Sequence, residues 1–321
     1  RMAVAEPLDD RVQVFGRAPG AEPSVDPLRP TDGRPSPHFG FDLDADGTWM
    51  AVTEPESGRV HLYDTRLGEE PIRIATFGGR GAGLLKYMRP SAVDVDLESR
   101  SVLVCDPGRR ILEEVRLRID PTADLAQHLG AAQAIRRLDF QQLYLARDET
   151  PVLKGLRWPI CPTGVLRDRE RTYVLDAANR TIVEFDTSWT PQRMLPCDTF
   201  GDPRSITMGA DGLLWVTDAQ VGQVLGFQTR GSRFGEPGPR VGAGRLEQPH
   251  GVLVLEDRTM YVSDAGTDAV IRFDAEGNEV DRVGSSGLGP DQFRKPRALA
   301  QDGEGRLIVN DHANHRGFLL T

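Results

Sequence analysis

A repeated unit of short apolar runs is the feature that most restricts how this chain can fold. Its clearest copy spans residues 248–273 and reads QPHGVLVLEDRTMYVSDAGTDAVIRF. A Pro-x-Gly lead-in is followed by apolar runs at residues 252–255, 260–263 and 270–273, with polar turns between them. Runs of this length, rich in β-branched and aromatic residues and bounded by Gly, Asp or Asn, are typical of antiparallel strands. The unit therefore predicts one small sheet.

The unit can be aligned six times along the chain. Six lead-ins are predicted to begin an innermost strand, at residues 38–40, 90–92, 162–164, 203–205, 249–251 and 296–298. The second strand of each copy ends at an acidic residue, and these are Glu54, Asp106, Asp176, Asp218, Asp264 and Asp311. Small sheets repeated around an axis make a propeller. We therefore predict an all-β, six-bladed β-propeller that forms a single domain over residues 1–321.

The last copy lacks a fourth strand, because Thr321 follows directly on its third strand. Residues 11–16, RVQVFG, resemble the missing strand and are followed by a Gly- and Pro-rich link. We predict that this amino-terminal strand completes the last blade, so that the closed ring has no long unpaired edge. In an alternative alignment, residues 4–6 are the second strand of a seventh copy, although no inner strand precedes them.

One segment after the second copy, residues 120–149, breaks the repeat. Asp120 and Pro121 are typical of a helix start, and Leu125, Leu129, Ile135 and Leu138 recur at roughly helical spacing. We predict a short helical insertion here. Three of its side chains could bind another protein, namely Phe140, Leu143 and Tyr144; alternatively, the insertion packs on the flank of its own propeller.

The composition excludes several classes of protein. No apolar run approaches the roughly 18 residues of a membrane span, and the net charge of -9 argues against a nucleic-acid partner. We expect a soluble protein, periplasmic or secreted in preference to cytoplasmic, with no leader sequence in this chain. The three cysteines form no metal-binding spacing, and Cys161 and Cys197 are predicted either to pair or to remain free thiols.

The family pattern is seen most fully at residues 173–186, YVLDAANRTIVEFD, and it resembles the NHL-repeat family of six-bladed β-propellers. The resemblance implies the fold more strongly than the function, because such propellers include protein-binding domains, RNA-binding domains and enzymes. One enzyme branch, the peptidyl-hydroxyglycine amidating lyases, carries metal-binding histidines at Pro-His lead-ins. In this chain the resemblance to that branch is limited to His250, for which it implies a metal-binding role.

Three consecutive lead-ins place cationic side chains at one mouth of the predicted channel. The residue after the lead-in proline is Arg204, His250 and Arg297 in the fourth, fifth and sixth copies, and Ser91 and Thr163 in the second and third. Arginine is a planar donor to carboxylate or phosphate groups. We predict that Arg204, His250 and Arg297 bind an anionic group; alternatively, they pair with Asp218, Asp264 and Asp311.

A metal site is the competing hypothesis. Zinc would use His250, joined by His38, His312 or His315, because a catalytic zinc needs three converging protein ligands. Calcium, as in lactonase-like propellers, would use Glu54, Asn179 and Asp264. The acids recur in nearly every copy, however, and an Asp at such a position accepts hydrogen bonds from the following turn. A shared feature of this kind favours a structural role.

The sequence thus predicts a non-enzymatic binding or scaffolding module with a protein partner and no cofactor. A small anionic ligand is expected at the channel mouth. The alternative is a metal-dependent lyase or lactonase-like hydrolase at the same place, with Zn or Ca.

Overall fold

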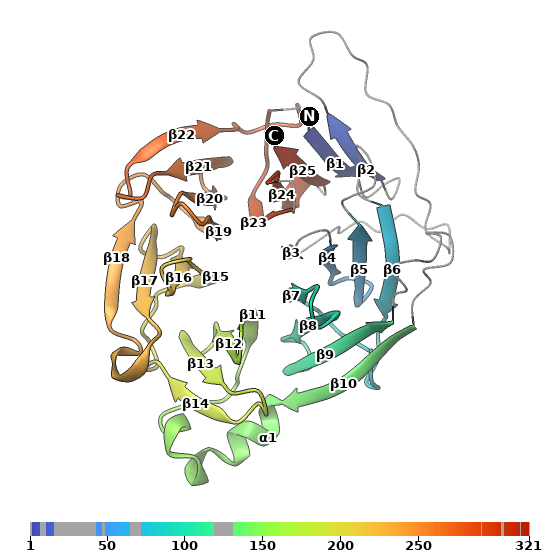
Figure 1. Ribbon diagram of the computed structural model, residues 1–321, viewed down its shortest axis with the longest axis vertical. Helices are drawn as coiled ribbons and strands as arrows, with labels where there is room; N and C mark the ends of the chain where they lie inside the picture. The colour runs from blue at the N-terminus through green and yellow to red at the C-terminus, as the bar shows by residue number, and fades with distance from the viewer. Residues whose placement is uncertain are drawn as a thin grey trace.

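The computed structural model describes residues 2–6, 11–15, 43–46, 49–64, 72–118, 131–289, 291–302, 305–314 and 316–320. Its strands form one five-stranded sheet and five four-stranded sheets, which surround a central axis (Figure 1). The chain is a β-propeller with little helix, which confirms the predicted all-β propeller architecture.

The strands occupy successive layers from the axis outward. The innermost strands are β3 (Leu43–Asp46), β7 (Ala92–Asp96), β11 (Pro162–Asp168), β15 (Pro203–Met208), β19 (Pro249–Val254) and β23 (Pro296–Gln301). The second strands are β4 (Trp49–Glu54), β8 (Ser101–Asp106), β12 (Arg171–Asp176), β16 (Leu213–Asp218), β20 (Met260–Asp264) and β24 (Leu307–Asp311). The third strands are β5 (Arg59–Asp64), β9 (Ile111–Arg118), β13 (Thr181–Phe185), β17 (Gln223–Gln228), β21 (Ala269–Phe273) and β25 (Arg316–Leu320). The outer strands are β6 (Ile72–Gly78), β10 (Ala131–Asp139), β14 (Pro191–Met194), β18 (Pro237–Val241), β22 (Glu279–Val283), β1 (Met2–Glu6) and β2 (Arg11–Phe15).

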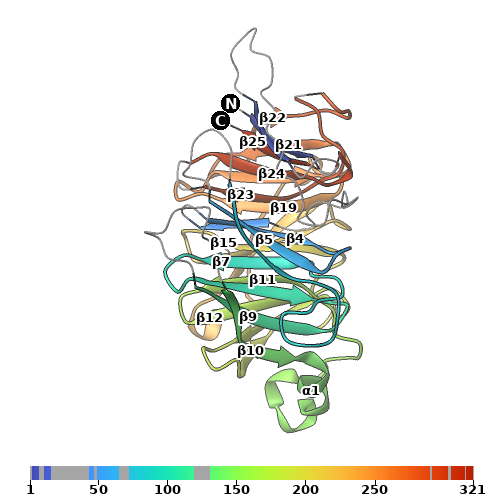
Figure 2. The same cartoon turned by 90° about the vertical axis from the view of Figure 1, so that its right-hand side faces the viewer.

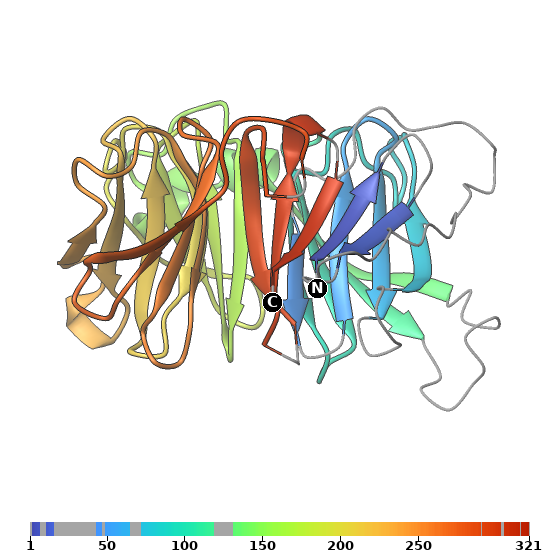
Figure 3. The same ribbon diagram turned by 90° about the horizontal axis from the view of Figure 1, so that it is seen from above.

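Neighbouring inner strands contact one another all the way round the axis, since β23 touches β3 as well as β19. The four-stranded sheets are antiparallel meanders, the five-stranded sheet is antiparallel as well, and the strands cross the thickness of the disc (Figures 2 and 3). The lead-ins to β7, β11, β15, β19 and β23 therefore lie at the same end of the disc as the turns between the second and third strands, whereas residues 38–40 lie outside the described residues. This topology gathers the lead-in residues of the different sheets at one channel mouth.

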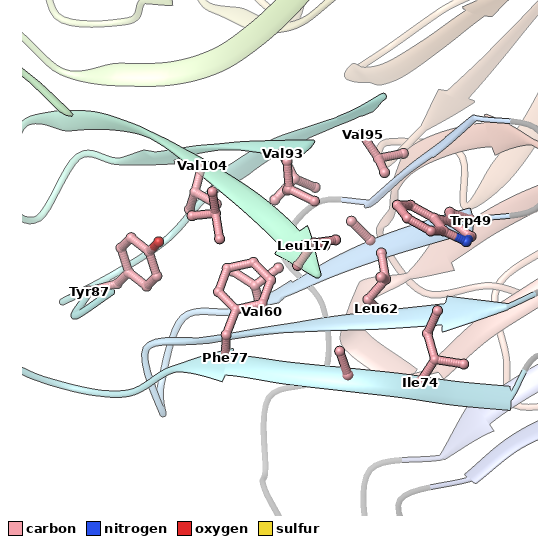
Figure 4. Packing of buried hydrophobic residues seen from close by; sticks show 14 of the residues in the cluster. Trp49, Val60, Leu62, Ile74, Phe77, Tyr87, Val93, Val95, Val104 and Leu117 are labelled. Carbon is pink, nitrogen blue, oxygen red and sulfur yellow. The ribbon is translucent and has the colours of Figure 1, made fainter. Parts of the chain in front are cut away.

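The hydrophobic core lies between adjacent sheets. Between the sheet of β3–β6 and the sheet of β7–β10, Trp49 and Leu62 of one sheet pack near Val95 and Leu117 of the other (Figure 4). All four side chains are buried. Burying a side chain of this size is worth about 1.5–3 kcal/mol, so these faces hold the ring together.

The ring is closed at the amino terminus, but by a different strand from the predicted one. The strand beside β25 is β1, with Val4 opposite Phe318, whereas β2 pairs only with β1 at the outer edge. The prediction that residues 11–16 fill the fourth position is therefore wrong, and so is the alternative of a seventh sheet around residues 4–6. The pairing of β1 with both β25 and β2 decides the order of the two strands.

The predicted helical insertion is not confirmed, because part of its range forms a strand. Ile135 and Leu138 lie on β10, which pairs with β9 along its whole length and has a bulge between Ala134 and Arg136. The helix α1 covers only Phe140–Leu145, and the side chain of Asp139 caps it by accepting a hydrogen bond from the backbone N–H of Gln141 at 2.8 Å. Residues 120, 121, 125 and 129 lie outside the described residues.

Short 3₁₀ turns complete the described part of the chain. They are η2 (Arg147–Glu149), η3 (Pro151–Leu153), η4 (Gly231–Arg233) and η5 (His312–Asn314). No helix within the described ranges is long and apolar enough to traverse a bilayer.

Candidate functional site

A cavity of about 90 Å³ between the inner strands is lined by four of the lead-in positions, and Arg297 is not among its lining residues. Arg204, His250, Ser91 and Thr163 all line it. They come from the beginnings of β15, β19, β7 and β11. A cavity needs a volume of about 10–15 Å³ to hold one water molecule, so this cavity has room for several waters or a small anion.

Backbone contacts between neighbouring sheets set the positions of these residues. The hydroxyl of Thr217 on β16 donates to the carbonyl oxygen of His250 at 2.6 Å, and the hydroxyl of Ser263 on β20 donates to the carbonyl oxygen of Arg297. A Cβ atom on Gly251 would lie 2.1 Å from that same Arg297 oxygen. Only glycine permits this approach, which explains the Pro-x-Gly lead-in.

The three predicted cationic side chains influence one another electrostatically. Burial lowers the pKa of His250 well below its ordinary value, and the charges of Arg297, Arg204 and His312 lower it further. Burial also lowers the pKa of Arg297 to about 10, with a contribution from the charge of Arg204. The structure therefore brings Arg204, His250 and Arg297 together. His312 in η5 joins them; the sequence named it only as a metal ligand.

Two carboxylates near the cavity are already engaged by arginine. Arg204, at the exposed rim, pairs with Asp202 and not with the predicted alternative Asp218. Deeper in the cavity, Asp94 accepts a 2.7 Å hydrogen bond from the backbone N–H of Arg167, whose side chain lies 3.9 Å from the same carboxylate. The negative charge that faces the cavity is thus partly offset.

Two hydroxyl groups complete the described part of the lead-in ring. Ser91 is 7% exposed, and neither its Oγ nor the buried Oγ1 of Thr163 has a hydrogen-bond partner among the described residues. A buried hydroxyl without a partner costs about 1–3 kcal/mol, so it is normally found paired. Both hydroxyls are therefore unpaired donors on residues that line the cavity.

The acids at the ends of the second strands hold the backbone of their own sheets. Asp264 accepts hydrogen bonds from the backbone N–H groups of Glu247, Gln248 and Gly266 at 2.7, 2.8 and 2.9 Å. Equivalent bonds run from residues 88 and 89 to Asp106, from residues 201 and 202 to Asp218, and from residue 294 to Asp311. This arrangement agrees with the structural interpretation of these acids.

The described side chains do not offer a metal ion a set of ligands. No group of three His, Cys, Asp or Glu residues converges on a possible metal position in the described ranges, and His38 and His315 lie outside them. The proposed calcium ligands are committed elsewhere: Glu54 lies 3.1 Å from His61, and Asn179 donates to Asp176 at 2.7 Å. Arg204 and Arg297 would also repel a divalent cation at His250.

The residues predicted to bind a partner are mainly core residues. Phe140 is buried between the second and third sheets, where Leu143 and Tyr144 pack partly buried against the same cluster. Leu145 and Trp158 are the neighbouring side chains that are exposed. Cys161 and Cys197 are free thiols here, and Cys197 donates to the carbonyl oxygen of Gly155 at 3.3 Å.

Comparison with models of known protein families finds no match. Among solved structures, the chain is similar to one from a nidogen–laminin complex, with a TM-score of 0.57 and 17% identity over 88% of this chain and 92% of that one. It is also similar to a catalytically inactive virginiamycin B lyase from Staphylococcus aureus with quinupristin, with a TM-score of 0.57 and 11% identity over 88% and 80%. A third neighbour, a protein of unknown function from Bacteroides thetaiotaomicron, has a TM-score of 0.59 and 14% identity over 99% and 90%. At these identities the likeness shows the propeller fold alone.

Proposed function

We propose that this chain is a six-bladed NHL-type propeller that acts as a non-enzymatic binding module and recognises an anionic group of a partner protein at the channel mouth. The observation that carries the proposal is the shared cavity between Arg204, His250 and the two hydroxyls, with Arg297 close enough to lower the pKa of His250. The nidogen neighbour, which was solved in complex with laminin, is consistent with a protein partner.

The electrostatics favour an anion over other ligands. Burial is the main cause of the lowered pKa values of His250 and Arg297, and the neighbouring positive charges lower both further, because cationic groups side by side in a partly buried site repel one another. A bound anion would remove the repulsion and replace the lost hydration with charge-assisted hydrogen bonds. The protein has a net charge of -9 and repels acidic partners in general. A local positive site therefore favours those acidic partners whose anionic group can reach it.

The competing proposal, a metal-dependent lyase or lactonase-like hydrolase centred on His250, has less support. One neighbour is a lyase, but its identity of 11% carries the fold and not the chemistry. Arg204 shares the cavity with His250, and the carboxylate there, Asp94, is already in contact with Arg167, which suits an anionic ligand better than a metal ion.

The proposal predicts that small anions stabilise the protein through Arg204 and Arg297. At one hundred times its Kd, a ligand that binds only the folded state adds about 2.7 kcal/mol of stability. Phosphate or acetate at constant ionic strength should therefore raise the Tm of the wild type by a few degrees. The Arg204→Ala/Arg297→Ala variant should not respond, whatever its own Tm.

Arg240→Ala is the matched control, because Arg240 is an exposed arginine on the outer strand β18. It should retain the wild-type response in a thermal-shift assay. An equal response from the wild type and the double variant would contradict the proposed site.

A further inference from the structure

We propose that the anionic group recognised at the channel mouth is a phosphate monoester, held between the arginines on one side and the hydroxyls of Ser91 and Thr163 on the other. This inference rests on the proposed function and deepens it. It starts from two buried hydroxyl oxygens that have no partner in the described part of the chain and that belong to Ser91 and Thr163, which line the same cavity as Arg204 and His250.

The order of the sheets places these groups on facing sides of the axis. Around the ring of inner strands, β7, which follows Ser91, is three positions from β19, which carries His250. Thr163 on β11 is likewise three positions from Arg297 on β23. A group centred on the axis can therefore meet a cationic side chain and a hydroxyl from opposite directions.

A phosphate and a carboxylate differ in how many hydrogen bonds they can accept from the donors of this site. A carboxylate offers about four lone-pair positions, and two guanidinium groups in forked contacts would use them all. The hydroxyls would then remain without partners. A phosphate monoester has three strong acceptor oxygens, so it can accept from both arginines and from both hydroxyls. Its charge of about -1.5 to -2 at pH 7 also compensates the two arginines together.

The charged groups around the cavity are compatible with this assignment. Asp94 is the carboxylate that lines it, and Arg167 contacts Asp94 from the neighbouring sheet. Asp202 contacts Arg204 at the exposed rim, where a stronger acceptor could displace it. The cavity volume of about 90 Å³ suits a phosphoryl group whose ester substituent extends through the mouth.

The test is calorimetric titration at pH 7.5 and fixed ionic strength with three probes: inorganic phosphate, acetate, and a phosphoserine peptide beside its serine counterpart. The variant is Ser91→Ala/Thr163→Val, and Ser188→Ala on an exposed turn is the control. We expect the wild type to bind phosphate more tightly than acetate. The double variant should lose about tenfold or more in phosphate affinity with less than a twofold change for acetate, since it removes two hydrogen bonds to a charged group.

Each outcome bears on a different claim. Binding of the phosphopeptide but not of its serine counterpart identifies a phosphorylated protein as a source, whereas binding of inorganic phosphate alone identifies a free anion. Equal affinity for phosphate and acetate, or an unchanged phosphate affinity in the double variant, would overturn the assignment and leave the anion site standing. Absence of binding by every anion to the wild type would instead refute the proposed function.

Folding of the variant is checked by its stability without phosphate. The two hydroxyls have no partner in the described structure, so removing them should not lower the free energy of unfolding. A marked loss of stability would show that they serve the fold, and it would count against the assignment.

Discussion

Replacing Gly251 with alanine should lower the free energy of unfolding by about 3 kcal/mol or more, because the new methyl group has no space. An ideal Cβ at this position lies 2.1 Å from the carbonyl oxygen of Arg297 and 3.1 Å from the Cα of Ala298. Both are backbone atoms of the neighbouring inner strand, so β19 and β23 would have to separate. Overpacking that moves backbone costs about 1–3 kcal/mol and occasionally more. The move would also break the hydrogen bond from the Gly251 N–H to Ser263, which is 2.8 Å long.

Gly83→Ala is the control for the glycine substitution. Its Cβ would meet only the Cγ of Lys86, at 3.8 Å. We expect this surface change to stay within about 0.5 kcal/mol. Denaturant unfolding of the two variants measures the difference, and equal midpoints would show that the inner strands are not in the close contact described.

Asp264→Ala should also destabilise the protein strongly, by about 3 kcal/mol. The carboxylate is fully buried and accepts from three backbone N–H groups, which belong to the loop leading into β19 and to the following turn. Each donor left without an acceptor in a buried site costs about 1–3 kcal/mol. Asp264→Asn retains one acceptor oxygen and should lose less.

The comparison for Asp264 is Asp281→Ala, which removes an exposed carboxylate from the outer strand β22. It should change stability by less than about 0.5 kcal/mol. If Asp264→Ala were as mild as this control in thermal and denaturant unfolding, the structural role of the acids that end the second strands would be refuted.

The repeated strands could be predicted because their pattern is local. Short β-branched runs that end at Asp264 or its equivalents mark the second strand in each sheet, and the Gly251 lead-in marks the first. The order of β1 and β2 could not be predicted in this way. Both segments are short strands near the amino terminus, and their places depend on pairing with β25 at the opposite end of the chain.

In the segment after the second sheet, a weak helical periodicity of apolar residues led to a helix prediction where the structure has a strand. Ile135 and Leu138 have the spacing of a helix, yet β9 offers a free edge, and pairing with it satisfies the backbone from Ala131 to Asp139. Phe140 then falls at the start of α1 and fills the junction between two sheets. Local spacing could not reveal that tertiary contact.

The candidate site was predictable in its cationic half. Arg204, His250 and Arg297 stand out because they interrupt a repeated position. Ser91 and Thr163 occupy that same position, but serine and threonine are common in lead-ins and imply no chemistry by themselves. Their significance comes from burial without a partner, which depends on how the neighbouring sheets enclose them. His312 enters the cluster through η5, outside the repeated position.

The central claim, that an anion binds beside His250, is tested most directly by the pKa of that imidazole. Burial and the positive charges of Arg297, Arg204 and His312 hold this pKa well below its ordinary value. A bound anion adds negative charge, so it favours the protonated imidazole and should raise the pKa. NMR titration of the histidine ring, assigned with His250→Gln, would be carried out with and without phosphate at equal ionic strength. A higher titration midpoint in phosphate is the result we expect, and identical midpoints under the two conditions would contradict an anion site at the channel mouth.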